Sequence, residues 1–257
     1  MFKEAIVRRY AEGTENTRKF LVLEGYMDYL SKDEVRTLVT SQTDYEALFR
    51  LEDEVGQTFY VDYDIFWDCE IDNAYVVQDG QIVALRISHI SLETVPEALQ
   101  LFSHVERLWI SHSPIRIIPN WFGNLISLRE LYFKCLEIET LPESVGNLAN
   151  LEKMKISESH NFSTLPENIG NLIKLTYLLV CGTRLNKVPY SIGQLKSLIS
   201  LELFRNKLKS IPDSIGQLKS LQTLDIQHNE IESIPDTVLK LPKLKRIDKY
   251  GNKIPHS

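Results

Sequence analysis

Residues 188–198 read VPYSIGQLKSL and residues 211–221 read IPDSIGQLKSL, so one pattern occurs twice at a spacing of 23 residues. The same frame occurs earlier, as LPESVGNL at residues 141–148 and as LPENIGNL at residues 165–172. Its proline recurs at steps of 23, 23, 24, 23, 23 and 23 residues, at Pro96, Pro119, Pro142, Pro166, Pro189, Pro212 and Pro235. Self-similarity at a fixed period of this length indicates a repeat architecture in which each unit stacks on its neighbours.

Each unit continues with the pattern L-x-x-L-x-L-x-x-N-x-L, and its clearest copies lie at residues 198–208 and 221–231. The alternating part predicts a short strand with one apolar face. We expect the amide of Asn206 or Asn229 to bond the backbone of the bend that follows. The proline presets a turn, and the chain then returns through a short irregular or helical segment. No unit can bury its own leucines, so stacked units form one core under a parallel sheet with strands about 4.8 Å apart.

These units resemble the leucine-rich repeat family. They are most similar to its 23-residue intracellular subclass (the Ras-related and plant intracellular groups), whose units read LPxxIGxLxxLxxLxLxxNxLxx. The resemblance extends from about Ile82 to Pro255. It implies an α/β fold, a right-handed horseshoe-shaped solenoid of about eight repeats with a parallel β-sheet on its concave face. It also implies a surface that binds proteins, although a fold alone does not define the partner.

The units depart from this pattern in two places. The asparagine position holds another residue in five earlier units, at Ile90, Ser113, Leu136, His160 and Thr183. The spacing of 24 residues predicts a local bulge at residues 159–161, where Asn161 can take that position instead of His160. The last unit is short, and Lys249 replaces its second strand leucine. We expect a polar C-terminal cap over about residues 241–257, with a basic recognition patch as the alternative.

The first eighty residues differ in charge from the rest. They contain 18 acidic and 8 basic residues, a net charge of −10, whereas residues 81–257 contain 17 and 21, a net charge of +4. We therefore expect a small acidic α+β capping domain at residues 1–74 and a leucine-rich repeat domain at residues 75–257.

Local signals predict the elements of the N-terminal part. Capping boxes at residues 31–34 and 43–46 predict two short helices, and the alternation in residues 59–67 predicts a strand. Asp79 and Gly80 lie between two β-prone runs, which predicts a hairpin over residues 75–87. This hairpin leads into the first repeat strand, Ile82 to Ile87, and covers the open edge of the sheet.

No motif in the chain predicts catalysis or a cofactor. Five acidic residues could suggest a calcium site, but they lack the order and the glycine of a calcium loop, which favours a solvated acidic face; they are Asp62, Asp64, Asp68, Glu70 and Asp72. Cys69 lies between two of these acids, which disfavour a thiolate, and residues 1–80 contain no histidine to act as its base. Three cysteines are too few for a disulfide framework. We expect no catalytic residue, no metal site and no cofactor.

The candidate partner-binding residues are the strand residues between the leucines, which point to the concave surface of such a solenoid. They form a basic and aromatic zone, an apolar zone and an acidic zone: Arg86, Arg107, Trp109, Tyr132, Lys134 and Lys155, then Tyr177, Leu179 and Phe204, then Glu202 and Asp225. Exposed Trp, Tyr and Arg are typical of interface hot spots, and an apolar centre with charged flanks suits a polypeptide. Alternatively, the aromatic residues reflect β-propensity, with Trp109 and Tyr132 stacked on each other.

These features favour a non-enzymatic protein–protein interaction module, a scaffold or adaptor in intracellular signalling, whose partner is a protein. An enzyme or regulatory subunit is the alternative, for example a ubiquitin-ligase-like protein with its chemistry in residues 1–74. Binding of nucleic acid or a membrane surface by the basic zone is disfavoured by the acids that alternate with its lysines, and we expect no small-molecule substrate.

No apolar run approaches the ~20 residues that span a bilayer, and charges interrupt the N-terminus, so we expect a cytoplasmic protein without a signal peptide. The acidic segment could also fold over the basic zone and occlude it.

Overall fold

The computed structural model describes residues 2–12, 30, 34, 38–39, 41–62 and 73–255. The chain divides into two compact units. Unit 1 comprises Met1–Ser91 and Pro96–Ile110, and unit 2 comprises Leu92–Val95 and Ser111–Ser257. Strand β4 (Arg107–Ser113) crosses this division.

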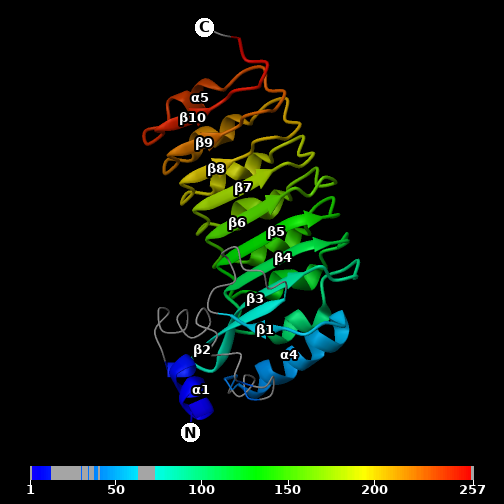
Figure 1. The fold of residues 1–257 in the computed structure, drawn as a ribbon. Helices are drawn as coiled ribbons and strands as arrows, with labels where there is room; N and C mark the ends of the chain where they lie inside the picture. Colours follow the sequence, from blue (N-terminus) through cyan, green and yellow to red (C-terminus); the bar gives the residue numbers. More distant parts are fainter. Residues whose placement is uncertain are drawn as a thin grey trace. The chain divides into compact units, whose positions relative to one another are not determined.

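Unit 1 contains the predicted hairpin. Its elements are α1 (Phe2–Glu12), α4 (Gln42–Val55), β1 (Tyr60–Val61), β2 (Ala74–Gln78), β3 (Gln81–Ser88) and the 3₁₀ helix η2 (Glu97–Leu101) (Figure 1). Strands β2 and β3 are antiparallel, and β1 pairs with β2 in parallel. Asp79 (φ 51°) and Gly80 (φ 76°) both adopt the left-handed conformation that a two-residue type I′ turn requires. The hairpin is confirmed, and β2 covers the edge of the first repeat strand.

Helix α4 begins earlier than its sequence signal indicates. The capping residue is Ser41, whose hydroxyl accepts a hydrogen bond from the Asp44 amide at 3.3 Å, so the prediction of a start at Thr43 is wrong. Thr43 lies inside the helix, and the Glu46 carboxylate accepts from the Gln42 side chain at 2.7 Å instead of closing a capping box. Gly56 ends the helix in the left-handed conformation. The capping box at residues 31–34 and most of the strand predicted at residues 59–67 lie outside the described residues.

Glu54 joins α4 to the first repeat within unit 1. Its carboxylate accepts hydrogen bonds from the amides of Glu97 and Ala98, at 2.8 and 3.0 Å, at the start of η2. Within unit 2, Glu143 makes the same kind of contact with the repeat that follows it. Its carboxylate accepts hydrogen bonds from the amides of Glu167 and Asn168. Helix α4 therefore stacks on η2 in the way that one repeat stacks on the next.

Unit 2 is a solenoid with a parallel sheet on one side. Its strands follow sequence order: β5 (Glu130–Leu136), β6 (Lys153–Ser157), β7 (Tyr177–Cys181), β8 (Ser200–Glu202), β9 (Thr223–Asp225) and β10 (Arg246–Asp248). Short helices return the chain behind the sheet, each directly after the repeat proline (Figure 1): η3 (Asn120–Asn124), η4 (Glu143–Asn147), η5 (Glu167–Asn171), η6 (Tyr190–Gln194), η7 (Asp213–Gln217) and α5 (Asp236–Leu239). With β3 and β4, these strands make up the eight repeat strands that the sequence predicts. The repeat leucines lie buried between the two layers.

Five repeats have a glycine at the point where neighbouring short helices approach closely. A Cβ atom on Gly193 would lie 2.4 Å from the carbonyl oxygen of Ser214 in the next repeat. On Gly216 it would lie 2.5 Å from the Thr237 side chain. The repeat spacing on this side of the sheet therefore depends on the missing side chain.

The predicted role of the repeat asparagines is confirmed. Asn229 donates from Nδ2 to the carbonyls of Leu203 and Ile226, and its Oδ1 accepts from the Leu208 amide at 3.0 Å. Asn206 and Asn252 make corresponding bonds in their own repeats. Asn206 and Asn229 are buried and Asn252 is partly buried, and together they form a ladder that satisfies the backbone groups of each bend.

In the 24-residue unit, the prediction that His160 or Asn161 takes the asparagine position is wrong. Ser159 takes it: the side chain is fully buried, and its hydroxyl accepts from the Leu136 amide at 3.2 Å and donates to the Ser157 carbonyl. The extra residue follows the asparagine position. Phe162, three residues after Ser159, is therefore buried in the place that regular units give to the leucine two residues after their asparagine. His160 and Asn161 are therefore exposed at the predicted bulge.

Candidate functional site

The candidate site in unit 2 is the sheet face, by which we mean the residues of β5–β10 that point away from the short helices. The strand register places corresponding residues of successive repeats directly beside one another. One such row is Tyr132, Lys155, Leu179, Glu202, Asp225 and Asp248. All but Tyr132, which is 7% exposed, are partly exposed. The row is the one that the repeat spacing predicts.

Lys155 is held between two tyrosines. Its ammonium lies 4.7 Å from the ring centre of Tyr132 and 5.3 Å from that of Tyr177. A cation at this distance over an aromatic face is attracted by the ring's electrons. The Tyr132 hydroxyl donates to Glu130 at 3.2 Å. Burial, followed by the charge and hydrogen bond of Glu202, raises the pKa of Tyr177. Charged and aromatic side chains are thus fixed in one continuous contact across β5–β8.

The apolar part of the sheet face adjoins this cluster. Leu179 and Phe204 are partly exposed, whereas Cys181 is buried. Burial and the nearby carboxylates of Glu158 and Glu202 raise the pKa of the Cys181 thiol to about 11. Burial also raises the pKa of Cys135. A raised pKa favours the neutral thiol, whereas an activated nucleophile has a lowered pKa.

Carboxylates line the C-terminal end of the sheet face. Glu202 lies directly beside Asp225 in the register of β8 and β9. Asp225 accepts from the side chain of Gln227, and Asp248 pairs with the guanidinium of Arg246 at 2.5 Å. Lys134, at the other end, is partly exposed on β5 beside Ser157 of β6. Within unit 2 the sheet face thus carries Lys134 and Lys155 with their tyrosines at one end and carboxylates at the other, and the binding of a partner by these residues stays a prediction.

Three of the predicted site residues belong to unit 1. Arg86 and Trp109 contact each other there, with the guanidinium carbon 4.8 Å from the ring centre, and Arg107 is partly exposed at the start of β4. The other eight lie in unit 2. Cys69 and the acidic residues 64–72 lie outside the described residues, as does the proposed occlusion by the acidic segment.

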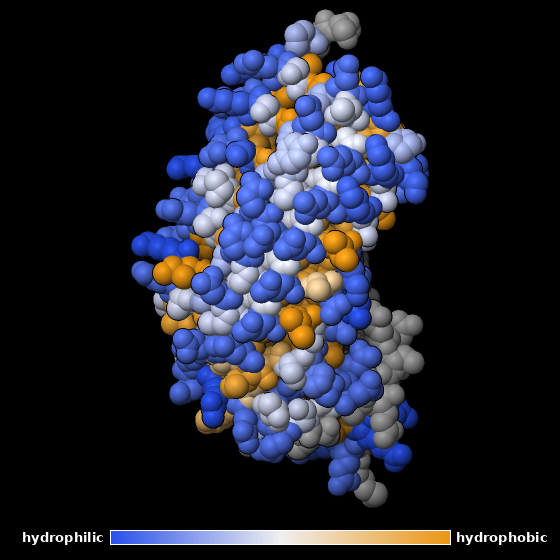
Figure 2. Space-filling view, turned by 180° about the vertical axis from the view of Figure 1, so that it is seen from behind, coloured by the Kyte–Doolittle hydropathy of each residue, from blue (hydrophilic) through white to orange (hydrophobic). Residues whose placement is uncertain are grey.

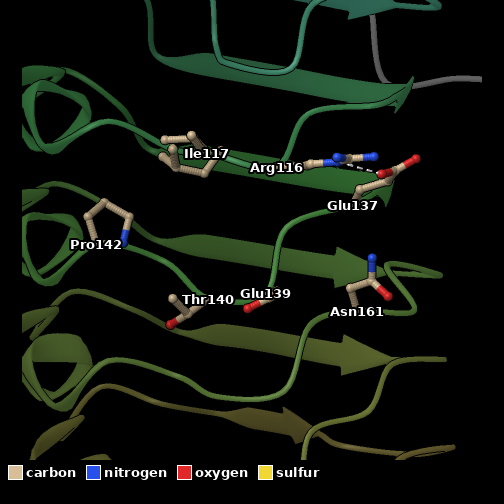
Figure 3. A pocket seen from close by; sticks show the side chains of 8 residues that line it. Arg116, Ile117, Glu137, Glu139, Thr140, Pro142 and Asn161 are labelled. Carbon is tan, nitrogen blue, oxygen red and sulfur yellow. Dashed lines mark hydrogen bonds and ion pairs between the residues drawn. The ribbon is translucent and has the colours of Figure 1, made fainter.

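A hollow on unit 2 has no counterpart in the sequence predictions. It has a volume of about 590 Å³ and is lined by Arg116, Ile117, Ile118, Glu137, Glu139, Thr140, Pro142 and Asn161 (Figure 3). Arg116 pairs with Glu137 at 2.8 Å at one side of the hollow (Figure 3). Backbone bridges join Thr94 to Ile117 and Thr140 to Thr164, but none joins Ile117 to Thr140 in the described chain. The only sequence signal near the hollow is the extra residue that exposes Asn161.

The described residues contain no cluster of three or more His, Cys, Asp or Glu side chains suited to a metal ion. In the same part of the chain, no helix has the length and apolar character needed to cross a membrane.

Residues 119–207 match the family described as "Leucine-rich repeat region", and residues 104–125 and 220–241 match the family described as "Leucine Rich Repeat". The chain is a leucine-rich repeat protein, as the resemblance of its units indicated. Its assignment to the 23-residue intracellular subclass stays a prediction.

Solved structures share the fold over about two-thirds of this chain. A leucine-rich repeat protein of Leptospira interrogans superposes with a TM-score of 0.60 and 27% sequence identity, over 68% of this chain and 44% of that one. A TDR receptor superposes with a TM-score of 0.57 and 22% identity, over 70% of this chain and 29% of that one. This chain therefore spans less than half the length of either protein. No curated protein sequence matches it significantly.

Proposed function

We propose that the protein is a non-enzymatic binding scaffold, which binds a polypeptide partner on the sheet face. The observation that carries this proposal is the cluster of Lys155, Tyr132 and Tyr177 beside the partly exposed Leu179 and Phe204. Preordered aromatic and cationic side chains next to an apolar centre are what protein interfaces use as anchors, because ordering them on binding costs little entropy. Leucine-rich repeat domains in general bind proteins, which supports the same conclusion.

Finer parts of the proposal rest on the sequence. The resemblance to the intracellular subclass supports a cytoplasmic role as an adaptor in signalling. The acidic composition of residues 1–74 supports a cap on the array formed by residues 75–257. The raised thiol pKa values of Cys135 and Cys181 support a binding role over thiol chemistry in the repeats.

Affinity capture from cell lysate tests the proposal. The bait proteins are the wild type and a triple variant of the sheet face, Lys155→Ala/Tyr177→Ala/Phe204→Ala. A matched control removes the same classes of side chain from exposed positions elsewhere: Lys209→Ala, Tyr190→Ala and Ile117→Ala. We expect the sheet-face variant to lose a specific set of proteins that the control retains. Identical sets from all three baits would refute binding on this face.

A further inference from the structure

Four successive turns of unit 2 carry lysine and no acidic residue. These turns connect each short helix to the next strand and read NLIKLT at residues 171–176, QLKSLI at 194–199, QLKSLQ at 217–222 and KLPKLK at 240–245. Their six lysines, all exposed, are Lys174, Lys196, Lys219, Lys240, Lys243 and Lys245. We call this set the lysine edge. The two preceding turns differ, because Arg129 in one pairs with Glu152 in the other at 2.7 Å.

The turns of the lysine edge lie side by side. The amide of Ile199 donates to the Thr176 carbonyl, that of Gln222 to Ile199, and that of Lys245 to Gln222, each at 2.8 Å. Successive turns are thus one repeat apart along the solenoid, and their backbones lie about 5 Å apart at the strand spacing. The edge is a continuous line of positive charge.

The charge of this line is not neutralised within the described part of the chain. Lys196 and Lys219 donate to the carbonyls of Gly193 and Gly216, at 2.6 and 2.8 Å. Lys174 and Lys245 donate to the neutral side chains of Asn150 and Gln222. None of the six lysines forms an ion pair among the described residues. Their positive charges are therefore available to an external anion.

Exposed apolar side chains lie in or directly beside these turns. Ile173 is 60% exposed, Ile199 is 42% exposed, and Leu239, directly before Lys240, is 56% exposed. On the face drawn in Figure 2, hydrophobic residues likewise lie as small separate areas within a largely hydrophilic surface. Lysines interspersed with single aliphatic side chains are typical of surfaces that lie in the headgroup region of a membrane.

We propose that the lysine edge binds the surface of an anionic lipid bilayer. The residue composition of the lysine edge favours an anionic lipid surface over an acidic protein or a nucleic acid. Protein interfaces are depleted in lysine and enriched in arginine and aromatic residues, and nucleic-acid sites use arginine and stacking side chains. The four turns contain neither arginine nor an aromatic residue. A lipid surface needs only positive charge and a few apolar contacts, and the edge supplies both. The whole-chain charge of −6 hides this local excess.

Vesicle co-sedimentation tests the proposal on the full chain. The probes are vesicles of phosphatidylcholine alone and vesicles in which about one-third of the lipid is phosphatidylserine. We expect the wild type to bind only the anionic vesicles and to be released when salt shortens the screening length. Each lysine removed lowers membrane affinity about fivefold, so Lys174→Gln/Lys240→Gln/Lys243→Gln lowers it about 100-fold.

The matched control is Lys187→Gln/Lys207→Gln/Lys209→Gln. It removes the same charge from exposed positions in the segments that follow the strands, whereas the turns of the lysine edge precede the strands. We expect this control to bind anionic vesicles within about threefold of the wild type, and circular dichroism to show that both variants fold. Equal losses in the two triple variants, or wild-type binding to neutral vesicles as strong as to anionic ones, would overturn the proposal. So would a wild type that ignores the vesicles but binds a polyglutamate peptide through the lysine edge. The sheet-face variant keeps full vesicle binding, which separates this surface from the proposed protein-binding site.

Discussion

The ladder of Asn206, Asn229 and Asn252 predicts that neighbouring asparagines are energetically coupled, because they share backbone carbonyl acceptors. The carbonyl of Leu203 accepts from both Asn206 and Asn229, at 3.0 and 2.8 Å. The carbonyl of Ile226 accepts from both Asn229 and Asn252, at 3.0 and 2.7 Å. Each shared carbonyl therefore keeps one donor when a single asparagine is removed, and loses both only when two neighbours are removed.

The magnitudes follow from this sharing. In Asn229→Ala the Leu208 amide loses the bond to Asn229, which costs about 1–3 kcal/mol, and the weakened carbonyl contacts bring the total to about 3 kcal/mol. In Asn206→Ala/Asn229→Ala the Leu203 carbonyl also loses its second donor. The double variant is therefore destabilised by about 1–2 kcal/mol more than the sum of the single variants.

Urea unfolding of the two single variants and the double variant measures this coupling as a double-mutant cycle. The pair Asn206→Ala and Asn252→Ala is the control, because these residues share no carbonyl, and we expect their effects to add within about 0.5 kcal/mol. Asn186→Leu, at an exposed position, controls for a general loss of stability. Additive effects in the neighbouring pair, or the same coupling in the distant pair, would refute the sharing of acceptors.

Three further predictions concern single residues. In thermal unfolding, Gly193→Ala is expected to destabilise the fold by about 2–3 kcal/mol, because its Cβ would overlap Ser214. The control is Gly56→Ala, whose Cβ would meet no atom within 4 Å. It only strains a positive φ and is expected to cost about 1 kcal/mol in the same assay. At pH 8 the Cys181 thiol, with a pKa of about 11, is expected to react with iodoacetamide only after urea unfolding, and rapid modification of the folded protein in mass spectra would contradict this. Burial raises the pKa of Asp44 above its ordinary value of 3.8, although the hydrogen bond from Ile82 opposes the rise; the folded state then holds this proton more tightly than the unfolded state, so the contribution of Asp44 to stability falls as the pH rises above about 3.8. As the pH rises from 4 to 7, the free energy of unfolding of Asp44→Asn is therefore expected to increase relative to that of the wild type, as measured by urea unfolding. A difference between the two proteins that does not change with pH would contradict the prediction.

The repeat strands and their register were predictable because one period governs them all. The spacing from Tyr132 to Lys155 to Leu179 follows from the prolines alone, and the structure pairs these residues as expected. The hairpin at Asp79 and Gly80 was predictable because few sequences favour a type I′ turn. These features depend on patterns that recur or on local chemistry.

Other features depend on tertiary contacts that no local pattern encodes. One residue per repeat, directly before the asparagine position, has a positive φ, yet only two of these residues are glycines; the set is His89, His112, Cys135, Glu158, Gly182, Arg205, His228 and Gly251. Stacking of the repeats imposes this conformation against the preference of most residue types. The start of α4 was missed for a related reason: Ser41 is fixed by the hydrogen bond that its backbone amide donates to the Gly80 carbonyl, 39 residues away.

The chemistry of the sheet face was predicted by residue type but not by contact. The sequence places Lys155 beside Tyr132 in one row, whereas its second contact, with Tyr177, crosses to another row and depends on the side-chain conformation. Of the lysine edge, only the C-terminal part was anticipated from the sequence, as the alternative of a basic patch within residues 241–257. The rest was missed because Lys174, Lys196 and Lys219 belong to separate repeats whose turns become adjacent only when the repeats stack.

Hydrogen exchange of a complex captured by the wild type tests the proposed protein-binding role most directly. Backbone amides in β5, β6 and β7 are compared with those in the short helices η4, η5 and η6 on the other side of the sheet, with and without the partner. Binding on the sheet face predicts slower exchange and new protection in the residues at and beside these strands, centred on Lys155 and Tyr177. Protection confined to the short helices, or absent from unit 2, would contradict it.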